Sequence, residues 1–325
     1  MNSARFDILG IGNAIVDILA EVDDEFLAEQ GMIKGSMDLI DAERTDKLYA
    51  LMPPAVQTSG GSVANTAAVA AQMGVRSAFI GVVSDDEFGH IFRHDITSSG
   101  VHYVTPPAPP ALPSARCLII VTPDGQRTMN TFLGASSSLH PDYLDAEVIA
   151  ASAIVYLEGF LFYVPDSRES CLVAARLAHE AGRRVAISLS DFLCVERNLE
   201  AFRAMVRDHV DILFANESEL AALTGLDDFE AAAEVVRDQV ELAVLTRGAR
   251  GSVILRGGER VEVPAEPTEV VDTTGAGDAY AAGFMAGLVA DAPLAVCGRW
   301  GSRAAAETIR RLGARPLGDL SYLRG

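Results

Sequence analysis

The sequence predicts an α/β fold with a central, mostly parallel sheet flanked by helices and a small, discontinuous second sheet. Three observations predict it. From about residue 148 onward, short apolar runs alternate with helical patterns. These runs are apolar on both faces, which is typical of parallel strands covered by helices. The first third holds shorter strand-like runs of another kind. Ligand-binding loops are then expected at the carboxyl ends of the parallel strands.

The elements of the central sheet follow one another in strand–helix order. A buried N-terminal strand is expected at 6–12, and the others come after residue 148. Right-handed crossovers join such strands by default, so helices should cover both faces. The later strands are expected at 153–157, 185–189, 211–215 and 242–246, and helices at 166–181, 199–208 and 217–223.

The second sheet is expected from segments that are separated along the chain. A turn suited to a hairpin, Pro123-Asp124-Gly125-Gln126, joins its last two strands. We interpret residues 1–325 as a single domain with a small β lid from roughly 14–40 and 101–133. The strands of this lid are expected at 15–22, 36–40, 115–122 and 127–133.

Composition limits the classes of partner. The formal net charge of −19 disfavours a nucleic-acid backbone or an anionic membrane surface as a partner, so a small-molecule substrate is expected. Lys34 and Lys47 are the only lysines, and no Gly-Lys-Ser/Thr string is present, which excludes a Walker A loop. Phosphate must then be bound by backbone groups, arginine or a metal ion.

Cysteine usage and the lid bear on compartment and assembly. The four cysteines are widely spaced without a CxxC pair, which indicates reduced thiols in a cytoplasmic protein. Asp7 and Asp17 interrupt the apolar N-terminal stretch, so a signal peptide is not expected. Because edge strands of a lid invite pairing, we expect a monomer or a homodimer.

The strongest chemical signal is a small-residue loop that opens an apolar helix, Asp272-Thr273-Thr274-Gly275-Ala276-Gly277-Asp278. Backbone N–H groups and the dipole at a helix start bind anions, and Gly275, Ala276 and Gly277 leave these groups accessible. Asp278, in the first turn, is a candidate general base. The pair suits phosphoryl transfer to an alcohol, because the amides take the charge while the carboxylate accepts the hydroxyl proton. The alternative is a tight turn followed by an ordinary first-turn acid.

A second motif is a candidate for binding an acceptor molecule. Gly60 and Gly61 let the backbone approach a ligand closely, and Asn65, one turn later, donates and accepts hydrogen bonds. The alternative is a turn and a small-residue packing helix with Ser62 as its N-cap.

A third motif, Gly12-Asn13-Ala14-Ile15-Val16-Asp17, follows the first strand. An acid such as Asp17 in an apolar strand is costly unless it is paired. One carboxylate accepts two hydrogen bonds from a vicinal diol, so a ribose or another sugar is a suitable partner, with Asn13 beside it. The alternative is that Asp17 faces solvent.

Two further signals follow strand ends. Asn216 and Glu219 come after one buried strand, and Thr246, Gly248 and Gly251 come after the next. Their alternatives are a helix N-cap with first-turn acids and a plain turn.

Together these motifs resemble, over essentially the whole chain, the ribokinase-like (PfkB) family of carbohydrate and nucleoside kinases. Within that family the chain most resembles the adenosine kinases. The family marks are Gly60-Gly61 with Asn65, Asn216-x-x-Glu219, Thr246-Arg247-Gly248 and 272–278; the branch marks are Gly12-Asn13 with Asp17, 211–217 and the aromatic-rich 159–165.

The resemblance implies a kinase that transfers a phosphoryl group from ATP to a primary hydroxyl, the best match being the 5′-hydroxyl of adenosine, giving AMP and ADP. It implies ATP and Mg²⁺, and it is compatible with K⁺. The resemblance implies that Asp278 is the base and that Gly275, Ala276 and Gly277 form the anion hole. It implies an acceptor site made of Asn13, Asp17, Gly60, Gly61 and Asn65, and nucleotide contacts from Asn216, Thr246, Gly248, Gly251 and Thr274. It also implies that Glu219 holds Mg²⁺ through water and that Asp272 neighbours a monovalent cation.

Some implied roles have open alternatives. Arg127, after the hairpin turn, is expected either to meet the γ-phosphate from the lid or to be a solvated strand residue. Phe160, Phe162 and Tyr163 are expected either to stack on a purine or to lie in the core.

Two other functions stay open as alternatives. One is a sugar kinase acting on ribose, fructose or a keto-deoxy sugar acid; for the sugar acid, an arginine should be aimed at a carboxylate beside Asp17. The other is a catalytically silent nucleoside or nucleotide sensor.

Overall fold

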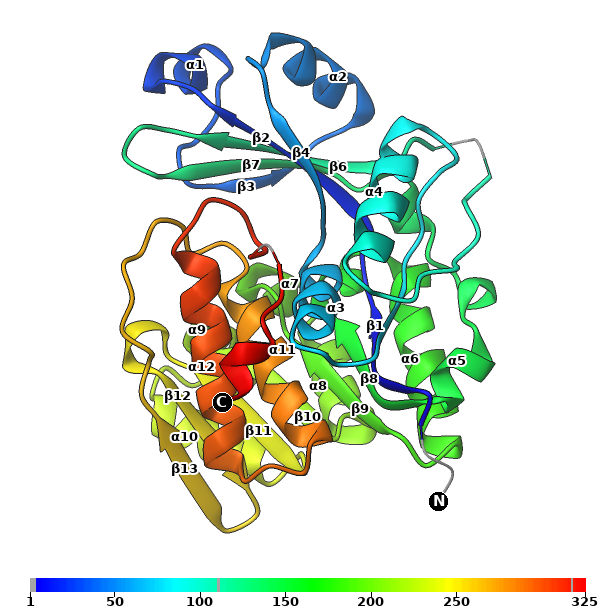
Figure 1. Ribbon diagram of the computed structural model, residues 1–325, viewed down its shortest axis with the longest axis vertical. Helices are drawn as coiled ribbons and strands as arrows, with labels where there is room; N and C mark the ends of the chain where they lie inside the picture. Colours follow the sequence, from blue (N-terminus) through cyan, green and yellow to red (C-terminus); the bar gives the residue numbers. More distant parts are fainter. Residues whose placement is uncertain (1–3, 110–111, 317) are drawn as a thin grey trace.

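A large α/β body and a small sheet at one end of it make up the molecule (Figure 1). The computed structural model describes residues 4–109, 112–316 and 318–325. The large sheet has eight strands in the order β13-β12-β11-β10-β9-β8-β1-β5. Its pairs from β5 to β11 are parallel, and β12 and β13 add an antiparallel edge, so the expected mostly parallel sheet is confirmed. The bounds are β1 (Phe6–Ile11), β5 (Ser77–Ile80), β8 (Ser152–Glu158), β9 (Arg184–Ser188), β10 (Ile212–Asn216), β11 (Leu242–Thr246), β12 (Ser252–Arg256) and β13 (Glu259–Val263).

Helices cover both faces of this sheet because successive strand residues point to opposite sides. Ile154 and Tyr156 of β8 face the core that includes α3, α11 and α12, whereas Val155 and Leu157 face the core of α6, α8 and α10. The helices are α1 (Asp24–Glu29), α2 (Ala42–Leu51), α3 (Ser62–Gln72), α4 (Glu87–Ser98), α5 (Ala146–Ala150), α6 (Pro165–Glu180), α7 (Phe192–Arg197), α8 (Leu199–His209), α9 (Glu217–Thr224), α10 (Phe229–Arg237), α11 (Ala276–Val289) and α12 (Leu294–Ile309).

The small sheet has five strands in the order β3-β7-β6-β2-β4, and α1 and α2 lie on its outer side (Figure 1). Strand β4 is missing from the expected ranges 14–40 and 101–133, because its polar sequence shows no apolar pattern and only its pairing with β2 defines it. Residues 110–111 of the second range lie outside the described part of the chain. The bounds are β2 (Ile15–Glu21), β3 (Met37–Leu39), β4 (Val56–Gly60), β6 (Ala115–Val121) and β7 (Arg127–Phe132).

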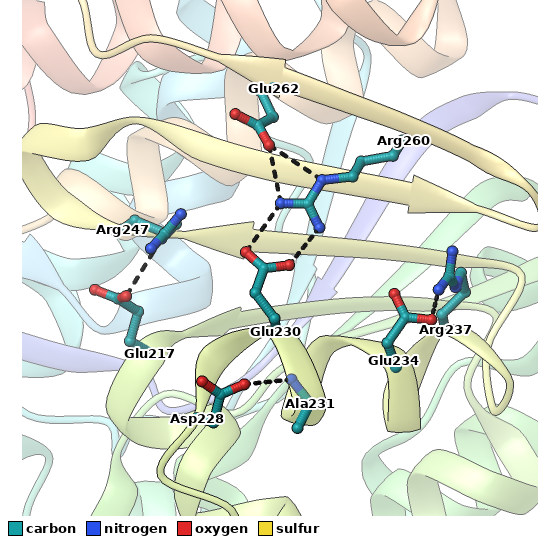
Figure 2. Close-up of polar contacts among 9 residues, drawn as sticks. All are labelled: Glu217, Asp228, Glu230, Ala231, Glu234, Arg237, Arg247, Arg260 and Glu262. Carbon is teal, nitrogen blue, oxygen red and sulfur yellow. Dashed lines mark hydrogen bonds and ion pairs between the residues drawn. The ribbon is translucent and has the colours of Figure 1, made fainter.

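Charged pairs join the antiparallel edge of the large sheet to the helices next to it. Figure 2 shows Arg260 of β13 donating to both carboxylate oxygens of Glu230 on α10, at 2.7 and 3.1 Å, and to Glu262. Arg247, directly after β11, donates to Glu217 at the start of α9 at 3.3 Å. Exposed ion pairs add little stability, so the apolar core holds this edge in place and the pairs align it.

The cysteines and the helices complete the description. The four cysteines are buried and free, and burial raises the pKa of each thiol. They are therefore protonated at neutral pH. Among the described residues, no helix combines the length and the apolar character that crossing a membrane requires.

Candidate active site

Helix α11 begins at the small-residue loop. Gly275 has a φ of +75°, and an added Cβ would collide with the C-terminal loop, so glycine is required there. The N–H of Ala276 donates a hydrogen bond to the carbonyl oxygen of Thr273 at 3.2 Å. No described residue accepts a hydrogen bond from the N–H of Gly277 or of Asp278. These two amides lie at the positive end of the α11 dipole and are available to an anion.

Asp278 faces a cavity of about 270 Å³. Its Oδ1 accepts a hydrogen bond from Ser62 Oγ at 2.7 Å, and its Oδ2 accepts one from Asn65 Nδ2 at 3.1 Å. Burial raises the pKa of Asp278 to about 6, while both hydrogen bonds and the nearby Arg315 guanidinium act in the opposite direction. Such a carboxylate is mostly ionised at neutral pH and more basic than an exposed one. Gly275, Ala276, Gly277, Phe160, Asn216, Glu219 and Thr246 line the same cavity.

Asn65 contacts protein groups on both sides of its amide. Its Oδ1 accepts a hydrogen bond from Arg315 Nε at 2.6 Å, and Arg315 Nη1 donates to Ser59 Oγ at 2.6 Å. Asn65 therefore links Asp278 to Arg315, and its expected contact with an acceptor hydroxyl stays a prediction.

Asp17 of β2 packs directly against the loop before α3. An added Cβ at Gly60 would meet the Asp17 carboxylate, and one at Gly61, whose φ is +98°, would meet the carbonyl oxygen of Asn13. Both glycines thus permit a close approach of the two backbones. Asp17 is only 9% exposed, so the solvent-facing alternative is wrong. Burial raises its pKa to about 7, against the opposing effect of Arg315.

Glu158, the last residue of β8, holds the other side of this loop. Its Oε1 accepts a hydrogen bond from Asn13 Nδ2 at 2.6 Å, and its Oε2 accepts from the N–H groups of Asn13 and Val63 at 3.3 and 3.1 Å. Burial raises the pKa of Glu158 to about 7. These contacts fix the orientation of the Asn13 amide, with its nitrogen toward Glu158.

A cleft of about 970 Å³ lies between the small sheet and the C-terminal loop, and Asp17 and Arg315 line it. Alternate residues of β2 share the face of Asp17, and in the parallel register Asp17 is paired with Cys117 and Leu19 with Ile119. This face therefore combines one carboxylate with an apolar surface. We call the apolar part the lid underside; it consists of Ile15, Leu19, Cys117, Ile119, Val121 and Met129.

A second cleft, of about 610 Å³, lies beside the start of α11. Thr246, Gly248 and Gly251 line it, and Gly251 has a φ of +82° at a point where a Cβ would collide with Val263. Their contact with a nucleotide stays a prediction. The other walls are mostly small and apolar. They include Ala249, Ala265, Pro267, Val270, Ala305 and Ile309, while Thr246, Thr273, Ala276, Gly277 and Tyr280 line both this cleft and the cavity of Asp278.

Asn216 and Glu219 form a capping box at the start of α9. Asn216 Oδ1 accepts from the Glu219 N–H at 2.9 Å, and the Glu219 carboxylate accepts from Asn216 N and Nδ2 at 2.9 and 2.7 Å. Burial raises the pKa of Glu219 to about 7. In the described part of the chain, no group of three or more acidic, histidine or cysteine side chains could hold a metal. One carboxylate and one amide facing the cavity fit Mg²⁺, which keeps several of its waters.

Other predicted residues have protein partners. The Asp272 carboxylate accepts hydrogen bonds from the N–H groups of Thr274 and Gly313 at 3.0 and 2.8 Å, and it forms an ion pair with Arg127. We therefore assign no cation to Asp272, and Thr273 lines the cavities where Thr274 does not. Arg127 is buried and reaches from β7 to the loop before α11, so the solvated alternative is wrong.

The aromatic residues after β8 divide into two groups. Phe162 is buried and stacks on Phe202 with ring centroids 4.1 Å apart, so it belongs to the core and not to the site. Phe160 lines the cavity of Asp278, and its ring stacks with that of Tyr163 at 6.5 Å.

Ser62, Glu158 and Arg315 have roles that the sequence did not predict. Ser62 looks like an N-cap, but Gly61 is the N-cap and Ser62 contacts Asp278. Glu158 carries a usable signal, because it is an acid at the end of a buried apolar strand, as Asp17 is. Arg315 lies in a C-terminal segment without a motif, so no sequence signal indicated its role.

The pfkB family carbohydrate kinase model matches residues 33–319. Among solved structures, the adenosine kinase from Sinorhizobium meliloti is 48% identical, with a TM-score of 0.93 and 98% of each chain covered. A probable sugar kinase protein from Rhizobium etli CFN 42 is 45% identical, with a TM-score of 0.93 and coverage of 98% of this chain and 97% of that one. The adenosine kinase of Saccharomyces cerevisiae is 29% identical over 336 residues, which covers 96% of this chain and 97% of the relative.

The family model includes the loop that carries Asp278, and the match to the Sinorhizobium meliloti structure covers nearly the whole chain. The family implies ATP as the phosphoryl donor, and typically Mg²⁺ with it. The chain belongs to the pfkB family of carbohydrate kinases, and it is a nucleoside or sugar kinase.

Proposed function

We propose that the protein transfers the γ-phosphoryl group of ATP to the 5′-hydroxyl of adenosine, and that the small sheet closes over the acceptor as a lid. The observation that carries the proposal is the face of β2 on which the Asp17 carboxylate lies beside the lid underside. A carboxylate suits the two hydroxyls of a ribose, and an apolar surface next to it suits a base. A simple sugar would need polar partners in place of the apolar surface.

The proposed steps at the reacting atoms use Asp278 and the start of α11. Asp278 accepts the proton of the 5′-hydroxyl while the hydroxyl oxygen forms a bond to the γ-phosphorus. The bond between that phosphorus and the bridging oxygen of ADP breaks, and the electron pair leaves with ADP. The N–H groups of Gly277 and Asp278 stabilise the charge on the transferred group.

Donor binding is assigned to the second cleft. Its small apolar walls suit the adenine ring of ATP, and Thr246, Gly248 and Gly251 suit contacts with ribose and phosphate. Asn216 and Glu219 would hold Mg²⁺, which neutralises phosphate charge when it is bound.

The test is an acceptor screen with the purified protein, ATP and Mg²⁺, with ADP release as the readout. The panel contains adenosine, other nucleosides, ribose, fructose and a keto-deoxy sugar acid. We expect the highest kcat/KM with adenosine, and ³¹P NMR should show a 5′-phosphomonoester. A higher kcat/KM with a sugar would overturn the nucleoside assignment and leave the kinase assignment in place.

The sugar-acid alternative is addressed by Arg315, which lies near Asp17. Its Nε and Nη1 donate to Asn65 and Ser59, and its Nη2 has no hydrogen-bond partner among the described residues, so a higher kcat/KM with the keto-deoxy sugar acid in the screen would assign this arginine to the carboxylate of the acceptor. The sensor alternative predicts nucleoside binding by calorimetry with no ADP formed from any acceptor.

A further inference from the structure

Arg315 is a basic side chain set among acidic groups beside the proposed base. Its Nε and Nη1 donate to Asn65 Oδ1 and Ser59 Oγ, both at 2.6 Å, and its buried Nη2 has no hydrogen-bond partner among the described residues. Burial lowers the pKa of Arg315 to about 10, so it stays charged at neutral pH. It belongs to the C-terminal loop, 250 residues after the Asn65 that it contacts.

A side-chain amide ends in an oxygen and an NH2 group, and only the NH2 group can donate a hydrogen bond to a carboxylate. Asn65 Nδ2 donates to Asp278 Oδ2, whereas its Oδ1 would repel the same oxygen if the amide were turned over. The Arg315 guanidinium has only hydrogen-bond donors, so it can pair with the oxygen of the amide but not with its NH2 group. The guanidinium therefore selects the orientation in which the nitrogen faces Asp278.

We infer that Arg315 is a positioning residue for phosphoryl transfer: through Asn65 it keeps a hydrogen-bond donor aimed at Asp278 and so keeps that carboxylate ionised and oriented. The inference rests on the proposed role of Asp278 as the base. It assigns Arg315 no contact with the substrate.

Other charged groups face Asp278 from the neighbouring elements, and they must be counted in any pH profile. Asp17 on β2, Glu158 on β8 and Glu219 on α9 lie close enough to Asp278 that its negative charge raises the pKa of each of them. The charge of Asp278 also raises the pKa of Tyr156 on β8. The charge of Arg315 acts on Asp278 itself and lowers its pKa, against the effect of burial.

The test compares Arg315→Gln and Arg315→Lys with the matched control Arg310→Gln. Arg310 has the same charge, lies five residues earlier and pairs with Glu307 on the surface. The measurements are the kcat–pH profile, KM for acceptor and for ATP, and the ¹³C chemical shift of the Asp278 carboxyl carbon against pH in the substrate-free protein.

We expect Arg315→Gln to lower kcat about tenfold, the scale of one hydrogen bond to a charged group, with little change in either KM. The acid limb of the profile and the NMR titration should both move up by about one pH unit. Arg315→Lys keeps the charge but loses the planar fork, so its profile should lie between those of the wild type and Arg315→Gln. The profile of Arg310→Gln should match the wild type.

An unchanged acid limb in Arg315→Gln, or a change in acceptor KM alone, overturns the inference. If Arg315→Gln does not fold, Arg315→Lys decides, and a wild-type profile for it overturns the inference. Asp278→Asn separates the two levels: if it retains turnover, the proposed base is wrong, whereas an inactive Asp278→Asn beside an unshifted Arg315→Gln refutes only the role of Arg315.

Discussion

The acceptor side and the donor side of the site are built in different ways. On the proposed acceptor side, Asp17 and Glu158 are buried and Asp278 and Arg315 are partly buried. Glu158, Asp278 and Arg315 form hydrogen bonds with residues of other elements, whereas Asp17 interacts with Arg315 and Asp278 through charge. On the donor side, the cleft is lined mostly by glycine, alanine and aliphatic side chains. The difference teaches how the two proposed tasks would be divided: proton transfer would use charges held in place by hydrogen bonds, whereas a flat nucleotide would be bound mainly by the shape of the cleft.

The largest expected effect is on the acceptor side. Asp278→Asn removes the base but keeps the shape, so turnover should fall by about two or more decades, the scale of losing a general base. ATP and acceptor binding, measured by calorimetry, should stay close to wild type. Near-normal turnover in this variant would contradict the proposed role.

The next effect concerns the glycine that brings α3 against β2. Gly61→Ala places a Cβ against Asn13 in a left-handed conformation, so unfolding stability should fall by at least ~2 kcal/mol, measured by urea denaturation. Gly182→Ala is the control, because Gly182 has a φ of +68° with open space around it. The control should lose only ~1 kcal/mol, and equal losses would show that the close approach is not the cause.

A third change tests whether the donor side acts by shape. Ala305→Leu adds volume to the cleft beside the start of α11, so KM for ATP should rise about tenfold, as for a steric loss of ~1.4 kcal/mol. The acid limb of the kcat–pH profile and KM for the acceptor should not change. A shifted acid limb would show that the two sides are not independent.

The last expected effect is a pH dependence of stability, which involves no change of shape at the site. The folded pKa of Glu158 is raised from 4.5 to about 7, so the folded protein holds the proton more tightly than the unfolded chain. The stability from this group is present below about pH 4.5 and is lost as pH rises through about 7. In urea denaturation, the stability of the wild type should therefore fall more steeply between about pH 5 and pH 8 than that of Glu158→Gln. Parallel curves would contradict the shifted titration.

The local parts of the fold and site were predictable. The apolar runs that became β8 to β11 and the loop that opens α11 are contiguous segments, so their pattern indicates them directly. Strand β4 and the contacts of Phe162 were not predictable. The position of a polar strand or of an aromatic ring depends on partners that are distant in the sequence, here β2 and Phe202.

By itself, the sequence determined the parallel sheet, the small-residue start of α11 and the presence of acids at strand ends. These follow from hydrophobic periodicity, glycine and residue type, which act over a few neighbours. Only the tertiary structure decided that Ser62 and Asn65 hold Asp278, that Arg315 stands behind Asn65, and that Asp272 meets Arg127. Hydrogen bonds and ion pairs between distant segments depend on how the elements pack, and no local pattern records that packing.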